Sequence, residues 1–149
     1  MDNKKHEVPL EIYIRNIFYS IRYSAEKNTA AYNITSSQGH LLEIIFDGLE
    51  SGEQISRKYL EDKMLLKGSS ITSLLNGLEK KGFINRNHSN SDGRALNISL
   101  TEKGTSAITQ VKLLFIDQDK KISKGMTTEE VDLFRQLLEK AYRNISEEL

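Results

Sequence analysis

The stretch from residue 69 to residue 104 constrains the fold of this chain more than any other part. A segment with helical periodicity runs to Gly82, two short alternating segments flank the pair Asp92-Gly93, and a new helix begins after Thr101. Glycine suits the left-handed position that often ends a helix, and an Asp-Gly pair supplies the positive φ angles of a tight hairpin turn. The order predicts a helix, a β-hairpin and a second helix. Because a lone hairpin is marginally stable, it must pack against neighbouring helices.

The segment at 69–81 has one apolar face and one face of short polar side chains. Its apolar residues recur at helical spacing and are Ile71, Leu74, Leu75 and Leu78. Its short polar residues are Ser69, Ser70, Thr72, Ser73 and Asn76. Such side chains favour helix less than Glu or Lys, but they let the backbone approach base edges and phosphates closely. Two interpretations stay open from this segment alone: a helix that enters a DNA groove, and a core helix with a serine-rich exposed side.

The hairpin favours the DNA-groove interpretation. We predict its strands at 83–89 and 94–100. An exposed arginine at the tip, Arg94, fits insertion into a narrow minor groove. Asp92 either orients the Arg94 guanidinium as its ion-pair partner or only forms the turn. Arg86, at a strand position, either contacts the DNA backbone or braces the hairpin.

Together these residues resemble the multiple-antibiotic-resistance regulator (MarR) family of winged helix-turn-helix transcription factors. The agreement in order and spacing covers residues 35–105 and rests on Ser70-Ile71-Thr72, Leu78–Ile84, Arg86, Asp92-Gly93-Arg94 and Leu100–Gly104. Two positions depart from the family pattern. Gly77 stands where the family usually has a polar or charged helix former, and Glu61 stands where it usually has alanine. The resemblance implies a homodimer that binds double-stranded DNA, and a small-molecule effector that changes the separation of its DNA-binding lobes.

The length of the chain suits a single domain over 1–149. We expect a mostly α-helical fold with a small β-hairpin wing, in which residues 35–100 form a winged helix-turn-helix DNA-binding lobe. The helical dimerisation region is expected at 9–31 and 101–147. A very short strand is expected at 53–55, beside the wing.

Capping signals predict where three of the helices begin. Thr35 with Gln38, and Thr127 with Glu130, have the spacing of capping boxes, and Ser56 suits a single capping serine. In the resembled family the helix that follows Thr35 touches a phosphate with its first turn, which the free N–H groups of a helix start favour. Capping alone explains Thr35 equally well.

Two segments carry more apolar surface than a monomer needs. Residues 113–116 are apolar on all sides of their helix, and the helix expected at 127–147 has apolar residues at alternating spacings of three and four. These patterns predict a homodimer with twofold symmetry. For the second segment, a core within one chain is the alternative.

Charge and composition narrow the class of protein. The net charge is zero, from 21 basic and 21 acidic residues, yet residues 63–94 hold six Lys/Arg against two acids, and residues 127–149 hold six acids against three bases. A basic face can bind phosphates on a protein that is not basic overall, although ordinary variation in surface charge gives a similar pattern. The absence of cysteine excludes disulfides and thiolate metal sites. No apolar run approaches the ~20 residues of a membrane span and no signal-type core follows the N-terminus, so we expect a cytoplasmic protein with no membrane partner.

No catalytic or metal-binding constellation stands out. His6, His40 and His88 share no ligand-type spacing, and the chain has no glycine-rich phosphate loop. Ser69 and Ser70 have no neighbouring base that would activate a nucleophile. We therefore expect neither enzyme activity, nor a metal, nor a cofactor.

We interpret the chain as a sequence-specific transcriptional regulator, and as a repressor in particular, that binds a pseudo-palindromic operator as a homodimer. The alternative is a winged-helix protein used for protein contact or for non-specific DNA architecture. The candidate DNA contacts are Thr35, Lys67, Ser69, Ser70, Thr72, Ser73, Asn76, Lys80, Arg86, Asp92 and Arg94. Candidates for the lining of a pocket for a small aromatic effector are Tyr13, Tyr19, Arg22, Tyr23 and His40, each of which packing or a helix surface explains as well.

Overall fold

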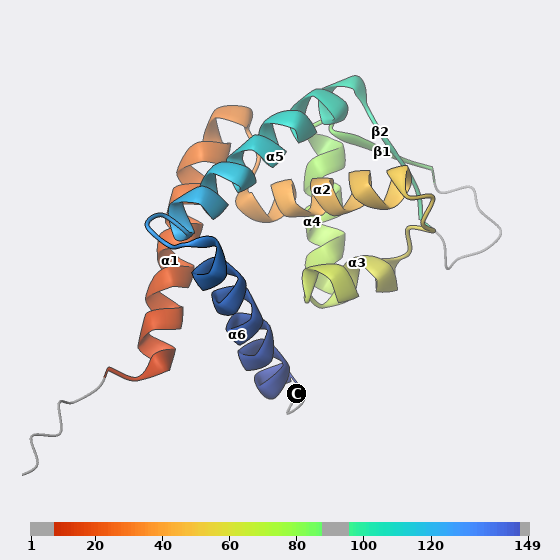
Figure 1. Ribbon diagram of the computed structural model, residues 1–149. Helices are drawn as coiled ribbons and strands as arrows, with labels where there is room; N and C mark the ends of the chain where they lie inside the picture. Colours follow the sequence, from red (N-terminus) through yellow and green to blue (C-terminus); the bar gives the residue numbers. More distant parts are fainter. Residues whose placement is uncertain (1–7, 88–95, 147–149) are drawn as a thin grey trace, which may run out of the picture. The chain divides into compact units, whose positions relative to one another are not determined.

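The computed structural model describes residues 8–87 and 96–146. In chain order its elements are α1 (Leu10–Thr29), the 3-10 turn η1 (Ala30–Tyr32), α2 (Ser36–Glu50), α3 (Arg57–Met64), α4 (Gly68–Lys80), β1 (Ile84–Asn87), β2 (Asn97–Leu100), α5 (Glu102–Ile122) and α6 (Thr128–Ser146) (Figure 1). Six α-helices and one hairpin in the described part confirm the predicted fold class. The chain divides into two compact units, Met1–Phe115 and Ile116–Leu149.

The predicted caps begin three helices. At α2, Thr35 Oγ1 accepts from the N–H of Gln38 at 3.2 Å and Gln38 Oε1 accepts from the N–H of Thr35 at 3.1 Å. At α6, Thr127 and Glu130 form the same reciprocal pair, at 2.8 and 3.2 Å. Ser56 Oγ accepts from the N–H of Tyr59 at the start of α3. These helix starts are set by local sequence, which is why the sequence predicts them.

Left-handed residues end α3 and α4. Gly82 has a φ of 76° just after α4, as its position in the sequence predicts. Leu65 ends α3 with a φ of 55°. It is 65% exposed, so burial of its side chain does little to offset the cost of this backbone conformation. A residue with a Cβ costs roughly 1–2 kcal/mol in this conformation. Nothing in the sequence pattern singled out Leu65.

The core of the first unit is built by α2, α3, α4, the hairpin and the start of α5. The apolar face predicted for α4 is confirmed, because Ile71, Leu75 and Leu78 are buried and Leu74 packs against them. The other fully buried side chains include Leu41, Leu42, Ile45, Leu60, Phe83, Ile84 and Val111. Since α4 is fixed along one whole face, its opposite face has a defined orientation.

The hairpin pairs β1 and β2 antiparallel, with Ile84 opposite Leu100 and Arg86 opposite Ile98. The strand expected at 53–55 is wrong: the structure has only an isolated bridge at Ser56, where the N–H of Leu96 donates to Ile55 O at 2.8 Å. The reason is that the chain turns into α3 at once, with Ser56 as its cap.

The second unit is a helical hairpin. It consists of the end of α5 and of α6, joined through Gly125, whose φ is 86°. No side chain of α6 is buried, although Leu133, Leu137 and Ile145 are large and apolar. Among the described helices, none is long and apolar enough to cross a membrane.

Candidate nucleic-acid interface

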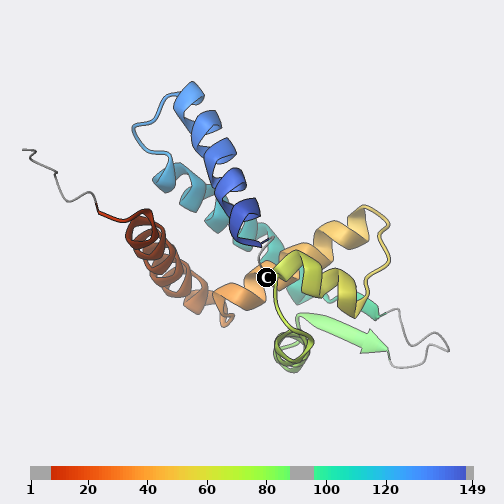
Figure 2. The same ribbon diagram turned by 90° about the horizontal axis from the view of Figure 1, so that it is seen from below.

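The outward face of α4 presents short hydroxyl side chains. Ser69, Ser70 and Ser73 are exposed, and none of their hydroxyls makes a hydrogen bond within the described part of the chain. Figure 2 views α4 nearly along its axis, with β1 beside it. The structure thus separates the buried apolar face of α4 from the polar face that the sequence predicted.

Exposed lysines lie at both ends of this face. Lys67 is the N-cap residue of α4 and makes no capping bond with its side chain, and Lys80 is the last residue of the helix. Lys81 is different, because its Nζ donates to Gln38 Oε1 at 2.9 Å and is engaged in the fold. Lys67 and Lys80 are therefore exposed cations, one at each end of α4, whose side chains form no hydrogen bond or ion pair with the described residues.

Arg86 braces the wing against α4. Its Nε donates to Glu79 Oε2 at 3.0 Å, its backbone N–H donates to Glu79 Oε1 at 3.2 Å, and Nη2 bonds both Glu79 and Asn76. Only 15% of the Arg86 side chain is exposed. Of the two roles open from the sequence, these contacts support bracing.

The same contacts restrict Asn76. Its Oδ1 accepts from Arg86 Nη2 at 2.6 Å, so the exposed side of this amide is its NH₂ group. The oxygen keeps a second lone pair, so the adenine N6 amino group could still donate to it while Arg86 remains bound. The bond from Arg86 therefore fixes the orientation of the Asn76 amide and occupies one of the two acceptor positions of its oxygen.

Thr72 is half-buried, and its hydroxyl is also engaged. Its Oγ1 donates to Gly68 O at 2.9 Å and accepts from Arg57 Nη1 at 2.7 Å. Sequence reasoning missed Arg57, because a separation of 15 positions from Thr72 corresponds to no local pattern. The only sequence signal was that Arg57 directly follows the capping Ser56, which places it in the first turn of α3.

Both departures from the family pattern lie at close contacts between a glycine and a longer side chain. A Cβ at Gly77 would lie 2.3 Å from Gln38 Nε2, so glycine leaves room for the capping-box glutamine. A Cβ at Gly68 would lie 2.6 Å from Glu61 Oε1, so the larger residue on α3 lies over a glycine on α4. Thr35 itself is exposed and serves as the N-cap of α2. Asp92 and Arg94 lie outside the described residues.

The residues suggested for an effector pocket are not joined to one another. Tyr13, Tyr19 and Tyr23 are exposed on α1, and Arg22 pairs with Glu26 at 2.9 Å. His40 stacks on Phe115 with ring centroids 4.1 Å apart. Burial lowers the pKa of His40. No hydrogen bond or ring contact among the described residues connects any two of these five.

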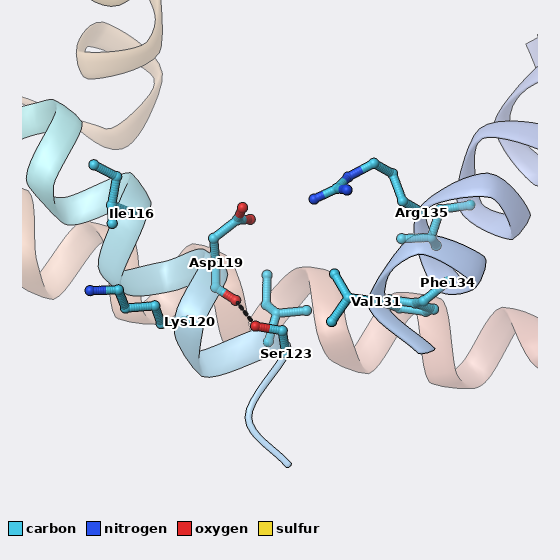
Figure 3. Close-up of a pocket in the computed structure, with 9 residues that line it drawn as sticks. Ile116, Asp119, Lys120, Ser123, Val131, Phe134 and Arg135 are labelled. Atoms are coloured by element: carbon cyan, nitrogen blue, oxygen red, sulfur yellow. Dashed lines mark hydrogen bonds between the residues drawn. The ribbon is translucent and has the colours of Figure 1, made fainter. Parts of the chain in front are cut away.

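A cavity that sequence reasoning did not anticipate lies within the second unit. It measures about 510 Å³, and Figure 3 shows side chains from α5 and α6 around it. Asp119, Lys120, Ser123 and Arg135 add polar groups to the apolar lining of Ile116, Ile122, Val131, Phe134 and Leu138. Three residues of the apolar seam predicted for α6 thus face the end of α5 in the same chain.

Two helices joined by a short turn, with the second helix exposed on its polar face and followed by a hairpin, define a winged helix-turn-helix protein. The model of a family described as transcriptional regulators SarA/Rot matches residues 24–111. The chain belongs to the MarR/SarA family of winged-helix transcriptional regulators. The resemblance seen in the sequence is confirmed, and the family is one of regulators rather than enzymes, as expected.

Individual relatives agree with this assignment. The HTH-type transcriptional repressor YetL of Bacillus subtilis is 24% identical over 139 residues, which are 92% of this chain and 82% of that protein. A MarR family transcriptional regulator from Clostridium acetobutylicum is 30% identical, with a TM-score of 0.70 over 93% of this chain and 98% of the other. The MepR-DNA complex of S. aureus has a TM-score of 0.84 at 21% identity, covering 95% of this chain and 99% of MepR, and supports the fold.

Proposed function

We propose that this chain is a homodimeric, sequence-specific DNA-binding repressor that acts in the cytoplasm on a pseudo-palindromic operator. The observation that carries the proposal is the face of α4 on which three serine hydroxyls, with no hydrogen-bond partner among the described residues, lie between Lys67 and Lys80. A helix so constructed can approach the floor of a major groove closely. YetL is named as a repressor and MepR was solved with DNA, which favours the same role for their relative.

The proposed contacts follow from this face. Ser69, Ser70 and Ser73 reach base edges or phosphates, while Lys67 and Lys80 hold phosphates on either side of the groove. The N-terminal turn of α2 at Thr35 contacts a phosphate. Arg94, oriented by Asp92, enters the minor groove. Thr72, Asn76 and Arg86 support the surface chiefly through the contacts they make inside the protein.

A second copy of the chain is the proposed partner for the uncovered apolar side chains. In α1, Tyr13, Ile14, Ile17 and Phe18 are each at least 43% exposed, and in α6 Leu133 and Leu137 are more than half exposed. Exposed apolar area of this extent is typical of an interface. In a twofold dimer two α4 helices would enter successive major grooves, with half-site centres ~34 Å apart.

Selection of bound sequences from a random duplex pool tests the proposal. The Kd for the selected operator and for a scrambled duplex should then be compared at one fixed salt concentration, because non-specific binding depends strongly on salt. We expect a clear preference for the operator, and Arg94→Ala should weaken operator binding by ~1–3 kcal/mol. Lys124→Ala, an exposed change between α5 and α6, is the control.

Each outcome has a definite meaning. Equal affinity for operator and scrambled duplex would favour the architectural alternative, and an unchanged Kd for Arg94→Ala would remove that residue from the site. Transcription in vitro from a template that carries the selected site should fall as the protein is added. A rise would show activation instead of repression.

We also propose release of the DNA by a small aromatic effector, which rests on the family alone. A series of hydroxybenzoic acids is the suitable probe. They should raise the melting temperature of the free protein and increase its Kd for the operator, since a ligand acts through its preference for the form that does not bind DNA. If neither quantity changes, this part of the proposal is wrong.

A further inference from the structure

We propose that Arg57 contacts a DNA phosphate beside the groove that α4 enters, and that Thr72 is the residue that holds Arg57 in position. The inference rests on the proposed function and adds to it a residue from α3. Arg57 is the first residue of that helix and is exposed. Its Nη1 donates to Thr72 Oγ1, on the neighbouring helix, at 2.7 Å.

The Thr72 hydroxyl has a fixed direction. Its proton goes to Gly68 O, one turn earlier in α4, at 2.9 Å. Since a hydroxyl has a single proton to donate, Thr72 can then serve Arg57 only as an acceptor. Thr72 therefore acts as a positioning residue for the guanidinium.

The path of the Arg57 side chain brings it to the start of α4. Its Cδ lies 3.6 Å from the point that a Cβ on Gly68 would occupy, so the chain passes directly over this glycine. Ser69 is three residues before Thr72, and such residues are neighbours on a helix surface. The guanidinium is thus at the same end of α4 as Ser69 and Lys67.

Arg57 forms no ion pair with the described residues, although Glu61, one turn along α3, places its Oε1 over the same glycine, 2.6 Å from the point that a Cβ on Gly68 would occupy. No carboxylate oxygen of the described residues lies within 4.0 Å of it, whereas its neighbour Lys58 pairs with Asp62 at 2.7 Å. A guanidinium has five N–H donors, of which Thr72 takes one. The remaining donors form the planar group that matches a phosphate.

The position of Arg57 on α3 favours a phosphate, and not a base edge, as its target on DNA. In a helix-turn-helix the first helix crosses the DNA backbone, while the second helix lies in the groove. A side chain that starts on α3 and ends over the first turn of α4 is therefore near the sugar-phosphate backbone that borders the groove. Because Thr72 already orders this side chain, binding costs less conformational freedom.

The test compares Arg57→Ala, Arg57→Lys, Thr72→Val and the control Lys58→Ala in the chain of residues 1–149, on operator and scrambled duplex over a range of salt. We expect Arg57→Ala to raise both Kd values about tenfold, and to reduce the slope of log K against log salt by ~0.9 for each phosphate that is no longer neutralised. Arg57→Lys should keep the slope, and Lys58→Ala should bind as the wild type does. Thr72→Val should weaken binding in the wild type but add nothing to Arg57→Ala.

Thermal unfolding of each variant identifies a loss of binding that is caused by unfolding. If the wild type binds DNA and Arg57→Ala has the same Kd and slope, the inference is wrong while the proposed function stands. If the weakening is confined to the operator with an unchanged slope, the phosphate assignment is wrong. Should the wild type bind no duplex at all, the proposed function and this inference fail together.

Discussion

Gly77 lies in the middle of α4, where glycine costs about 1 kcal/mol relative to alanine. The side chain of Gln38 occupies the space next to it, and its amide oxygen accepts two hydrogen bonds, from the N–H of Thr35 at 3.1 Å and from Lys81 Nζ at 2.9 Å. A single amide thus ties the start of α2 to the end of α4. An alanine at this position would force that amide to shift, because its Cβ would lie 2.3 Å from Gln38 Nε2.

This predicts the sign of a double-mutant comparison. Gly77→Ala should lower the free energy of unfolding by about 1 kcal/mol, because displacement of Gln38 outweighs the gain in helix propensity. In a Gln38→Ala background the same change should instead raise it, by up to about 1 kcal/mol. Urea unfolding of the four proteins measures both values. Stabilisation by Gly77→Ala in both backgrounds would contradict the steric explanation.

We expect His40 to make the stability depend on pH. Burial lowers its pKa from the ordinary value of 6.5, and its ring stacks on Phe115. The unfolded chain therefore binds a proton more readily, and the free energy of unfolding should fall as the pH drops below about 6.5. Burial, together with Asp47, raises the pKa of Glu43, and Lys112 moderates that rise. The effect of Glu43 on the free energy of unfolding as the pH drops is therefore opposite to that of His40.

Substitution of the histidine isolates its share. Between about pH 7.5 and about pH 5.5, the wild type should lose more stability than His40→Gln, which removes the imidazole together with its 4.0 Å contact to Glu43 and keeps Asp47 and Lys112. Urea unfolding at both pH values gives the difference. Equal losses in the two proteins would show that His40 has the same pKa folded and unfolded.

Arg86 joins β1 to α4 through its hydrogen bonds to Glu79 and Asn76. Arg86→Met retains the length of the side chain but removes the donors that Glu79 and Asn76 share. We expect the free energy of unfolding to fall by roughly 1–2 kcal/mol, since the contacts are partly buried, and operator affinity to fall as well. Calorimetry and anisotropy measure the two effects.

A matched exposed arginine provides the control. Arg135 pairs with Asp132 at 3.3 Å while 68% of its side chain is exposed. Arg135→Met should change stability by less than about 0.5 kcal/mol, because exposed ion pairs contribute little. Similar effects at Arg86 and Arg135 would mean that the wing does not depend on the brace.

Elements whose boundaries depend on neighbouring residues could be predicted, and contacts between distant residues could not. Thr35, Ser56 and Thr127 cap helices through bonds to residues three positions away, which a sequence displays directly. The Arg57–Thr72 and Arg86–Asn76 bonds depend on how α3, α4 and β1 pack. The polar face of α4 follows from helical spacing, so the sequence predicts it. The hydrogen bonds of Thr72 to Arg57 and of Asn76 to Arg86 join different elements, so the sequence does not predict them.

At the scale of the whole molecule, α6 carries two rows of apolar residues, of which one is uncovered. Val131, Phe134 and Leu138 line the cavity beside α5, while Leu133 and Leu137 are 55% and 54% exposed. If a second copy covers the latter row, a carboxylate there should prevent association. We expect Leu137→Glu to halve the mass measured by light scattering at micromolar concentration, because an unpaired charge at an apolar interface is costly.

Gln136→Glu, at an exposed neighbouring position, controls for the added charge and should keep the wild-type mass. Circular dichroism should show helical content in Leu137→Glu close to that of the wild type. A wild-type protein that is already monomeric at this concentration would contradict the proposed dimer.

The lack of any buried side chain on α6 has a consequence for how the protein behaves when it is scarce. An isolated helix of this length is barely stable in water, so α6 depends on whatever surface covers it. Amide hydrogens of α6 should therefore exchange faster on dilution, while those of α4 are retained. The folded fraction of α6 would then depend on the protein concentration through mass action alone.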